Sequence, residues 1–386
     1  MKIARYLSKI KKIINFRIIL SSLQIFFYSL TSQNTRYPKY LLKFELEIAK
    51  FFNTKYALTF SNGTTALNAI LYSVGVKKNS KVLISKLSFP SVISSILRIG
   101  AIPIYLDFDK NLQIKKLDKK EILNANFLLI THTFGIPQNM LLINKFLEIN
   151  PEIILIEDIS HSQGAKIENF FAGTLGVASF MSMQGDKAIS AGEGGVAFTN
   201  DERIYNKMFY LMHLNRPNKE NPKFNLLSRI GFLGKGRMSP IGAVWALRDL
   251  TNLKKRNNIL RKKFKIIYDG LKNCKDLNAP AIDNFDNIGG FYYGLPVFIK
   301  SQKILQFLKK YFHITRYNWP HLDKSEDFND PDKFINLIYS SEPNVSKVFE
   351  KSNDIRDELY FFDLKSLLLM NNYVIKKKII NFTKKL

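Results

Sequence analysis

The sequence predicts an α/β protein with a large, mainly parallel seven-stranded sheet, helices on both of its faces, and a smaller α+β C-terminal domain. Three observations indicate this class. Between about residues 55 and 200, short apolar runs rich in β-branched residues alternate with helical patterns. The runs are almost continuously apolar, which is typical of strands covered on both faces. At 386 residues the chain can bury one large core and a smaller one, so two domains are expected.

The expected strands follow one another at short intervals. They lie at Tyr56–Phe60, Val82–Ser85, Ile102–Asp107, Phe127–Thr133, Ile153–Asp158, Val177–Met183 and Gly195–Asn200. Helical patterns fall between several of them, as at Thr64–Ser73 and Met140–Ile149. The glycine-rich turn Gly192–Gly195 joins the last two strands, so this pair is free to run in opposite directions.

A long helical pattern, Ile241–Leu271, is expected to lead from the large domain into the second one. The second domain is expected to contain a strand at Phe291–Ile299, a helix at Ser301–Phe312 and a lysine-rich amphipathic helix from Tyr373. The predicted divisions are an N-terminal segment of residues 1–40, a large domain of residues 41–250 and a small domain of residues 251–386.

Charge and composition limit the classes of partner. The net charge of +26 favours anionic partners such as nucleic acid, acidic membranes or phosphorylated substrates. The lysines are spread along the whole chain, however, and no zinc finger or RNP motif is present, so nucleic acid is not expected. The single cysteine, Cys274, excludes an intrachain disulfide, and the five histidines lack metal-ligand spacing. We therefore expect no metal and a reducing, cytoplasmic compartment.

Residues 1–35 combine early lysines with an apolar stretch, Ile13–Leu30, that Arg17 and Gln24 interrupt. Three interpretations are open: packing on the protein or a partner subunit, attachment to a membrane surface, and a membrane span. A span needs ~20 largely uncharged apolar residues, which this stretch does not supply. An amphipathic helix that packs on protein or lies on a membrane surface is the better fit.

The strongest chemical signal is Lys187, which follows the apolar run Val177–Met181 and precedes a glycine-rich turn. Upstream, Asp158 ends the buried run that starts at Ile153. A lysine amine forms a Schiff base with the aldehyde of pyridoxal 5'-phosphate, and a carboxylate keeps the pyridine nitrogen of that cofactor protonated. An amine and a carboxylate at the ends of neighbouring strands therefore predict this cofactor.

Other residues at strand ends suit the same cofactor. Gly63 and Thr64 begin a helix, whose N-terminus offers free amides to a phosphate. Ser182 lies five residues before Lys187, so its hydroxyl could bind the same phosphate. The simpler interpretation is an ordinary helix cap. Phe89 is suited to stacking on a flat ring or to the core. His161 is either a donor to a ring oxygen or structural.

Seven segments, in order, resemble the landmarks of the DegT/StrS-type sugar aminotransferases, which are fold type I pyridoxal phosphate enzymes. The segments are Ser61–Leu67, Lys86–Phe89, Gly100–Asp109, His132–Pro137, Glu157–Ala165, Met181–Gly195 and Gly234–Pro240. The clear resemblance runs from about residue 44 to 250. It implies an aspartate-aminotransferase-like fold for this chain.

The resemblance also implies roles for individual residues. Lys187 corresponds to the Schiff-base lysine, Asp158 to the carboxylate on the pyridine nitrogen, and His161 to the contact with the ring oxygen. Phe89 corresponds to the aromatic that covers the ring, and Ser182 to a phosphate ligand. The loop that carries Lys235 resembles the one that reaches the cofactor phosphate of the neighbouring subunit, which implies a homodimer.

The function implied is transfer of an amino group from an amino acid, expected to be glutamate, to a keto group of a nucleotide-linked sugar. The product would serve surface polysaccharide or glycoconjugate synthesis. Relatives that act as sugar dehydratases have histidine in place of the lysine, so Lys187 favours amino transfer. Two alternatives stay open: another pyridoxal phosphate reaction on a sugar or cyclitol, and an inactive basic binding protein with the same fold.

Overall fold

The computed structural model describes residues 39–115, 125–214, 231–274, 276–319, 322–339 and 355–384, together with positions 23, 117, 216 and 229. The expectations for the N-terminal segment therefore lie outside the described residues and stay predictions. Within the described ranges, no helix is long and apolar enough to cross a membrane. No cluster of three or more His, Cys, Asp or Glu in these ranges could hold a metal ion.

The large sheet contains the seven strands that the sequence predicts. They are β1 (Tyr56–Phe60), β2 (Lys81–Ser85), β3 (Ile102–Leu106), β4 (Phe127–Thr131), β5 (Ile154–Asp158), β8 (Ala178–Ser182) and β9 (Gly195–Thr199). Their order across the sheet is β1-β9-β8-β5-β4-β2-β3. Strand β9 runs antiparallel to both of its neighbours, and the other described pairings are parallel. The prediction that the last two strands run differently is confirmed.

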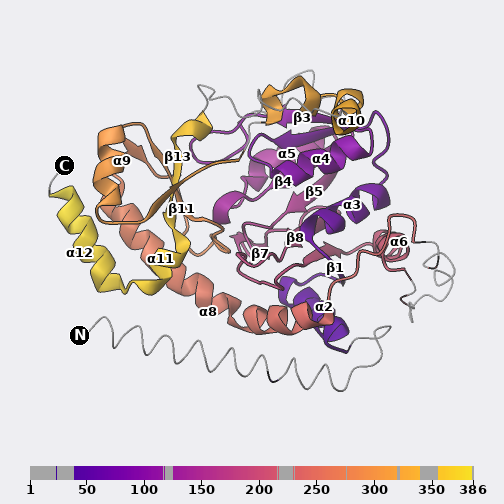
Figure 1. The fold of residues 1–386 in the computed structure, drawn as a ribbon, viewed down its shortest axis with the longest axis horizontal. Helices are drawn as coiled ribbons and strands as arrows, with labels where there is room; N and C mark the ends of the chain where they lie inside the picture. Colours follow the sequence, from indigo (N-terminus) through magenta and orange to yellow (C-terminus); the bar gives the residue numbers. More distant parts are fainter. Residues whose placement is uncertain are drawn as a thin grey trace.

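Helices cover both faces of this sheet (Figure 1). One face carries α3 (Gly63–Ser73), α4 (Pro90–Arg98) and α6 (Glu202–Met212). The other face carries α2 (Lys39–Phe52), α5 (Met140–Ile149) and the start of α8 (Pro240–Leu271). In β2, Val82 and Ile84 face the first set while Leu83 faces the second, because successive side chains of a strand point to opposite faces. Two buried faces explain the continuous apolar runs.

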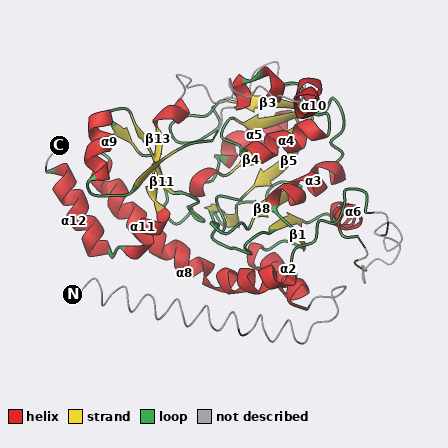
Figure 2. Cartoon of the chain, in the orientation of Figure 1, coloured by secondary structure: helices red, strands yellow, loops and turns green. Residues whose placement is uncertain are grey.

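A second, antiparallel sheet lies toward the C-terminus, with the order β10-β11-β13-β12 (Figure 2). Its strands are β10 (Leu277–Asn278), β11 (Gly294–Ile299), β12 (Ile314–Arg316) and β13 (Leu359–Asp363). Helices α9 (Gln302–Lys309), α11 (Leu364–Leu369) and α12 (Asn372–Thr383) belong to the same region. The strand expected from Phe291 starts only at Gly294, because Phe291 and Tyr293 have φ angles of 56° and 66°, which a strand does not allow.

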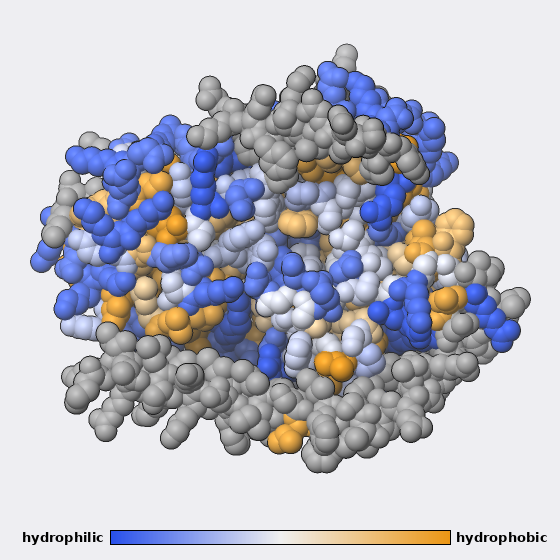
Figure 3. Space-filling model, viewed as in Figure 1, coloured by the Kyte–Doolittle hydropathy of each residue, from blue (hydrophilic) through white to orange (hydrophobic). Residues whose placement is uncertain are grey.

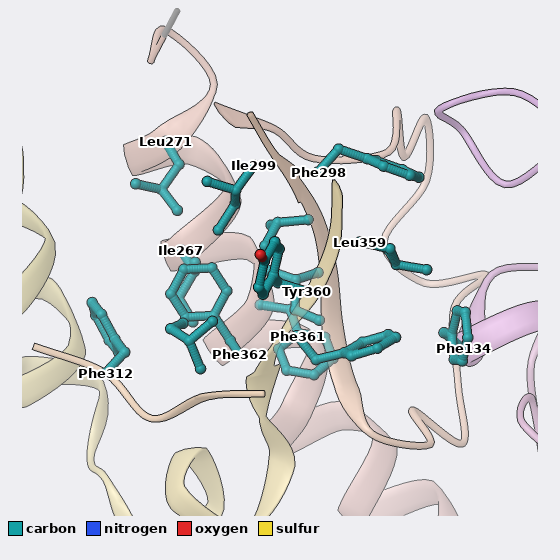
Figure 4. Packing of buried hydrophobic residues seen from close by; sticks show 14 of the residues in the cluster. Phe134, Ile267, Leu271, Phe298, Ile299, Phe312, Leu359, Tyr360, Phe361 and Phe362 are labelled. Carbon is teal, nitrogen blue, oxygen red and sulfur yellow. The ribbon is translucent and has the colours of Figure 1, made fainter. Parts of the chain in front are cut away.

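Helix α8, with 32 residues, joins the two cores. Near its start, Ala243 and Leu250 pack with α2. Near its end, Phe264 and Ile267 belong to the core of the second sheet. Figure 4 shows Ile267 beside the aromatic side chain of Phe362. The expected domain boundary at residue 250 falls inside this helix, and the domain limits stay a prediction.

Short elements complete the described chain. They are β6 (Lys166–Ile167), β7 (Phe170–Phe171), α10 (Pro331–Tyr339) and the 3₁₀ turns Thr133–Gly135, Leu322–Lys324, Glu326–Phe328 and Ile355–Glu358. A buried ion pair, Arg356–Asp323 (2.7 Å), joins two of these turns, and Arg356 also donates to the Lys86 carbonyl (3.1 Å). On the face in Figure 3, hydrophilic residues alternate with small apolar patches.

Candidate active site

A cavity of about 270 Å³ lies where β5 and β8 end and α3 begins. This edge of the sheet is the usual ligand position in open α/β folds. Every residue predicted for the site except Lys235 lines the cavity: Gly63, Thr64, Phe89, Asp158, His161, Ser182 and Lys187. A larger hollow of about 690 Å³ beside α6 contains none of them.

Lys187 lies in the turn after β8, where its N–H donates to the Gln184 carbonyl (2.9 Å). Its amine is enclosed and lies over the ring of Tyr292, with 3.3 Å between Nζ and the ring centroid. Burial lowers the pKa of Lys187 to about 7, although the charges of Asp158 and Asp186 act to raise it. Much of the amine is therefore neutral and nucleophilic near pH 7.

Asp158 is the last residue of β5 and is buried. Its Oδ1 accepts a hydrogen bond from the Ser160 N–H (2.8 Å). Burial raises the pKa of Asp158, whereas the hydrogen bonds from Ser160 and the charge of Lys187 act to lower it. The structure thus brings the predicted amine and carboxylate close enough to affect each other's ionisation. A buried carboxylate needs such cationic or donor partners.

The N-terminus of α3 and the end of β8 form a cradle at one end of the cavity. Asn62 caps the helix, because its side chain accepts from the Thr65 N–H (2.8 Å). The amides of Gly63 and Thr64 have no acceptor within the helix, and both residues line the cavity. A Cβ on Gly63 would lie 2.9 Å from the Cβ of Ser182, so only glycine lets the helix end approach β8 this closely.

His161 is buried, and its ring stacks on Tyr292 and on Phe134 at centroid distances of 4.7 and 5.2 Å. Burial, with the nearby charge of Lys187, lowers the pKa of His161 well below its usual value. Its Nδ1 is buried and has no hydrogen-bond partner among the described residues. A neutral imidazole with an unpaired nitrogen suits a polar ligand atom in the cavity.

Phe89 is 40% exposed, which argues against a core position, and its ring contacts Trp319 edge-on at 5.0 Å. Trp319 in turn donates from Nε1 to the Tyr293 hydroxyl (2.9 Å). An aromatic side chain that is partly free, held from behind by a buried indole, is suited to cover a flat ligand ring.

Lys235 is the predicted site residue that the structure does not bring to the cavity. It is exposed and lines a separate hollow of about 320 Å³ with Arg216 and Arg237. The loop is held against the chain because Gly236 accepts from the Ser61 N–H (2.7 Å) and donates to the Met212 carbonyl (2.9 Å). Its predicted role toward a neighbouring subunit stays a prediction.

Behind the cavity, Glu157 and His132 form a fully buried pair, with 3.0 Å between Oε2 and Nε2. The His132 Nδ1 accepts from the Gln138 N–H (3.0 Å), so the proton of the neutral ring is on Nε2 and is donated to Glu157. Burial acts to raise the pKa of Glu157, but His132 and the amides of Gly173 and Gly176 outweigh it and lower this pKa. This pair links the residue after β4 to a side chain of β5.

Tyr292 is a cavity residue that the sequence did not indicate, because the run from Phe291 reads as a strand. It lies in the loop before β11 and contacts Lys187 directly. One signal was available in the sequence: the glycine pair Gly289-Gly290 precedes three aromatic residues. Paired glycines are typical of a close backbone approach rather than of a strand interior.

The fold, with an amine and a carboxylate at the ends of β8 and β5, is that of the aminotransferase-like proteins of fold type I. The sequence model of the DegT/DnrJ/EryC1/StrS aminotransferase family matches residues 23–324. The chain belongs to this family, as its motifs predict.

Individual relatives agree with this assignment. GDP-perosamine synthase of Escherichia coli O157:H7 is 30% identical over 174 residues, which cover 44% of this chain and 48% of the relative. The chain spans about half the length of the curated relatives it matches.

Two solved structures share the fold. An aminotransferase of the same family from Brucella abortus has a TM-score of 0.74 at 17% identity and covers 96% of both chains. A GDP-4-keto-6-deoxymannose-3-dehydratase with a trapped PLP-glutamate geminal diamine has a TM-score of 0.69 at 20% identity, and the match covers 88% of this chain and 92% of that one.

Proposed function

We propose that this chain is a pyridoxal-phosphate-dependent aminotransferase that moves the amino group of glutamate to a keto group of a nucleotide-linked sugar. The observation that carries the proposal is the joint position of the Lys187 amine and the Asp158 carboxylate in one cavity that ends in a phosphate cradle. Each of these groups alone is common in proteins, but together they are the set that this cofactor requires.

The residues present fit pyridoxal phosphate. The amides of Gly63 and Thr64 and the Ser182 hydroxyl would hold the phosphate, and a Cβ at residue 63 would fill this cradle. Asp158 would bind the pyridine nitrogen, and the unpaired Nδ1 of His161 provides a contact for a polar ring substituent. When bound, the cofactor supplies an electron sink for the carbanion at the substrate Cα.

The chain's own residues supply binding and proton transfer. The Lys187 amine would hold the cofactor aldehyde and would accept and return the proton at the Cα of the amino donor. Its pKa of about 7 suits both tasks, because the neutral amine accepts a proton and the ammonium group returns it. Asp158 would hold a proton at the ring nitrogen, and Phe89 would cover the ring face.

Glutamate and a nucleotide-linked sugar are proposed as substrates from the relatives. The dehydratase of similar fold holds a PLP-glutamate adduct, and the perosamine synthase carries a GDP-linked sugar in its name. The strong positive charge of the chain, +26, favours an acceptor with a diphosphate. A role in surface polysaccharide or glycoconjugate synthesis follows from such a product, and a cytoplasmic location stays a prediction.

Sugar dehydration is the second candidate, because a dehydratase shares the fold. Dehydratases of this family are expected to carry histidine where this chain has Lys187, so the lysine favours amino transfer. The two reactions differ in where the nitrogen of glutamate goes. Transfer places it on the sugar, whereas loss of a sugar hydroxyl group would release it as ammonia; glutamate is oxidised to 2-oxoglutarate in both, so the mass of the sugar product distinguishes them.

The experiment is a two-part assay of the purified protein. Loading with pyridoxal phosphate should produce a visible absorbance band that Lys187→Ala abolishes. Adding glutamate should then form 2-oxoglutarate, and a screen of keto-sugar nucleotides, starting with GDP-4-keto-6-deoxymannose, should identify the acceptor by mass. A protein that gains no band with the cofactor contradicts the proposal.

A further inference from the structure

We propose that the ring face of Tyr292 binds the Lys187 amine whenever this amine is not bonded to the cofactor, so that Tyr292 is a positioning residue of the reaction. The inference rests on the proposed function of Lys187 and adds a residue from the second sheet region to the site.

The first observation is the geometry of the contact. Nζ of Lys187 lies 3.3 Å from the centroid of the Tyr292 ring. Other lysine–ring contacts in the described ranges measure 5.2 to 5.6 Å. An ammonium group over a ring face is attracted by the negative charge of that face, and the attraction grows when water is excluded. Lys187 is half-buried in the cavity, so its amine meets the first condition and is partly shielded from water.

The second observation is that the ring is fixed in place. Tyr292 also stacks on His161 (4.7 Å between centroids, 25° between planes). The neighbouring Tyr293 ring packs at 4.4 Å. A ring that is already packed against its neighbours loses little conformational entropy when it binds the amine.

The third observation is the strained loop that presents the ring. Phe291 and Tyr293, on either side of Tyr292, have φ angles of 56° and 66°, a region that bulky residues rarely adopt. Such strain persists only where the surroundings impose it, and it gathers at functional sites.

The loop is bonded to the elements around it. The Gly290 carbonyl accepts from Arg256 (2.9 Å), and the Gly290 N–H donates to Asn257 (3.2 Å). A Cβ on Gly290 would lie 2.4 Å from the Gln163 nitrogen. Helix α8 and the segment after β5 therefore fix the loop, and with it the position of Tyr292.

The charged groups around the amine define what the ring adds. Asp158 on β5 and Asp186 in the turn both act to raise the pKa of Lys187. Asp186 also pairs with Lys365 (3.4 Å). Neutral His161 and the exposed Glu193 line the same cavity. Burial opposes the effect of the two aspartates, and the ring of Tyr292 is a further group that stabilises the ammonium form.

The test measures the pKa of Lys187 in cofactor-free protein, from the pH dependence of its labelling by an amine reagent, read by peptide mass spectrometry. Tyr292→Phe keeps the ring face and should leave the midpoint unchanged. Pentafluorophenylalanine at position 292 keeps the shape but reverses the charge of the ring face. It should lower the midpoint by about half a unit or more, because the loss of a cation–π contact disfavours the ammonium form.

Two comparisons separate the proposal from a merely structural role. Phe285→Leu removes the ring of another lysine contact (Lys265, 5.2 Å) and should leave the Lys187 midpoint unchanged. The proposal is overturned if Tyr292→Phe and the pentafluorophenylalanine variant have the same Lys187 midpoint. It is also overturned if the midpoint shifts only in Tyr292→Leu, a variant that removes the bulk of the ring, because packing alone would then explain the shift. Because the measurement needs no cofactor, its result is independent of whether the loaded protein transfers amino groups.

Discussion

Gly63 of α3 and Ser182 of β8 pack against each other so tightly that a Cβ on residue 63 would lie 2.9 Å from the Ser182 Cβ. The helix end and the serine hydroxyl can therefore face one small anion from two sides. Backbone amides at a helix N-terminus bind phosphate through their partial positive charge. The tight approach is the physical basis for a phosphate site at this end of the cavity.

Gly63→Ala should weaken cofactor binding by at least about tenfold, because the new methyl group must push the helix end away from Ser182 and lengthen charge-assisted hydrogen bonds. The dissociation constant from an absorbance titration measures the effect. Gly185→Ala is the matched control, since its Cβ would be 4.0 Å from the nearest atom. Equal affinities of the two variants would show that the cradle does not bind the phosphate.

Asp158→Asn should lower kcat/KM by about a hundredfold or more, because a neutral amide no longer favours the protonated ring nitrogen. The protein should fold normally, since the amide oxygen can still accept from the Ser160 N–H. Asp186→Asn removes a charge that also raises the Lys187 pKa, but from an exposed position, and should cost only a few-fold. Comparable losses in the two variants would contradict the role of Asp158.

The rate at which cofactor-free protein binds pyridoxal phosphate should rise with pH and level off above about pH 7, the pKa of Lys187. The rate rises with pH because the ammonium form present below this pKa has no lone pair, whereas the neutral amine is the nucleophile. In Asp158→Asn the midpoint should fall, because the lost negative charge no longer favours the ammonium form. Stopped-flow absorbance measures both, and a wild-type midpoint near 10 would be inconsistent with the buried amine.

Glu157→Gln should lower the free energy of unfolding by about 3 kcal/mol, because a buried carboxylate bonded to His132 and three amides becomes an amide that presents N–H groups to donors. Urea unfolding measures it, with the exposed Glu193→Gln as the control. The folded-state pKa of Glu157 is lowered, so its stabilisation is present above the unfolded pKa and is lost as pH falls through the folded one. The difference between wild type and Glu157→Gln should therefore shrink in acid.

If Lys235 completes the site of a neighbouring subunit, mixing inactive Lys187→Ala and Lys235→Ala proteins should restore activity. A mixed dimer keeps one site with both lysines, so random exchange should return about a quarter of the wild-type sites. Each variant mixed with wild type alone provides the control. No recovery after proven subunit exchange would show that Lys235 does not act across the interface.

The large sheet could be predicted strand by strand, because each strand is a short apolar run buried on two faces. The one antiparallel strand was also expected from the turn that precedes Gly195. The start of β11 could not be predicted, since its aromatic run favours a strand and the positive φ angles of Phe291 and Tyr293 are imposed by packing against α8 and the segment after β5.

The candidate site was predictable where it follows directly from strand ends, as for Asp158 and Ser182. Tyr292 was not, because its position depends on a contact between segments more than a hundred residues apart in sequence. The second hollow around Lys235 likewise depends on tertiary packing. Periodicity describes which face a residue occupies, but not which distant loop lies over it.

Helix α8 runs without interruption from the core of the large sheet to the core of the small one. The two cores are therefore joined by one continuous helix. A hinge between them would have to break helical hydrogen bonds in its middle. Substrate entry should therefore depend on movements of individual side chains and short turns. We do not expect it to depend on rotation of one domain against the other.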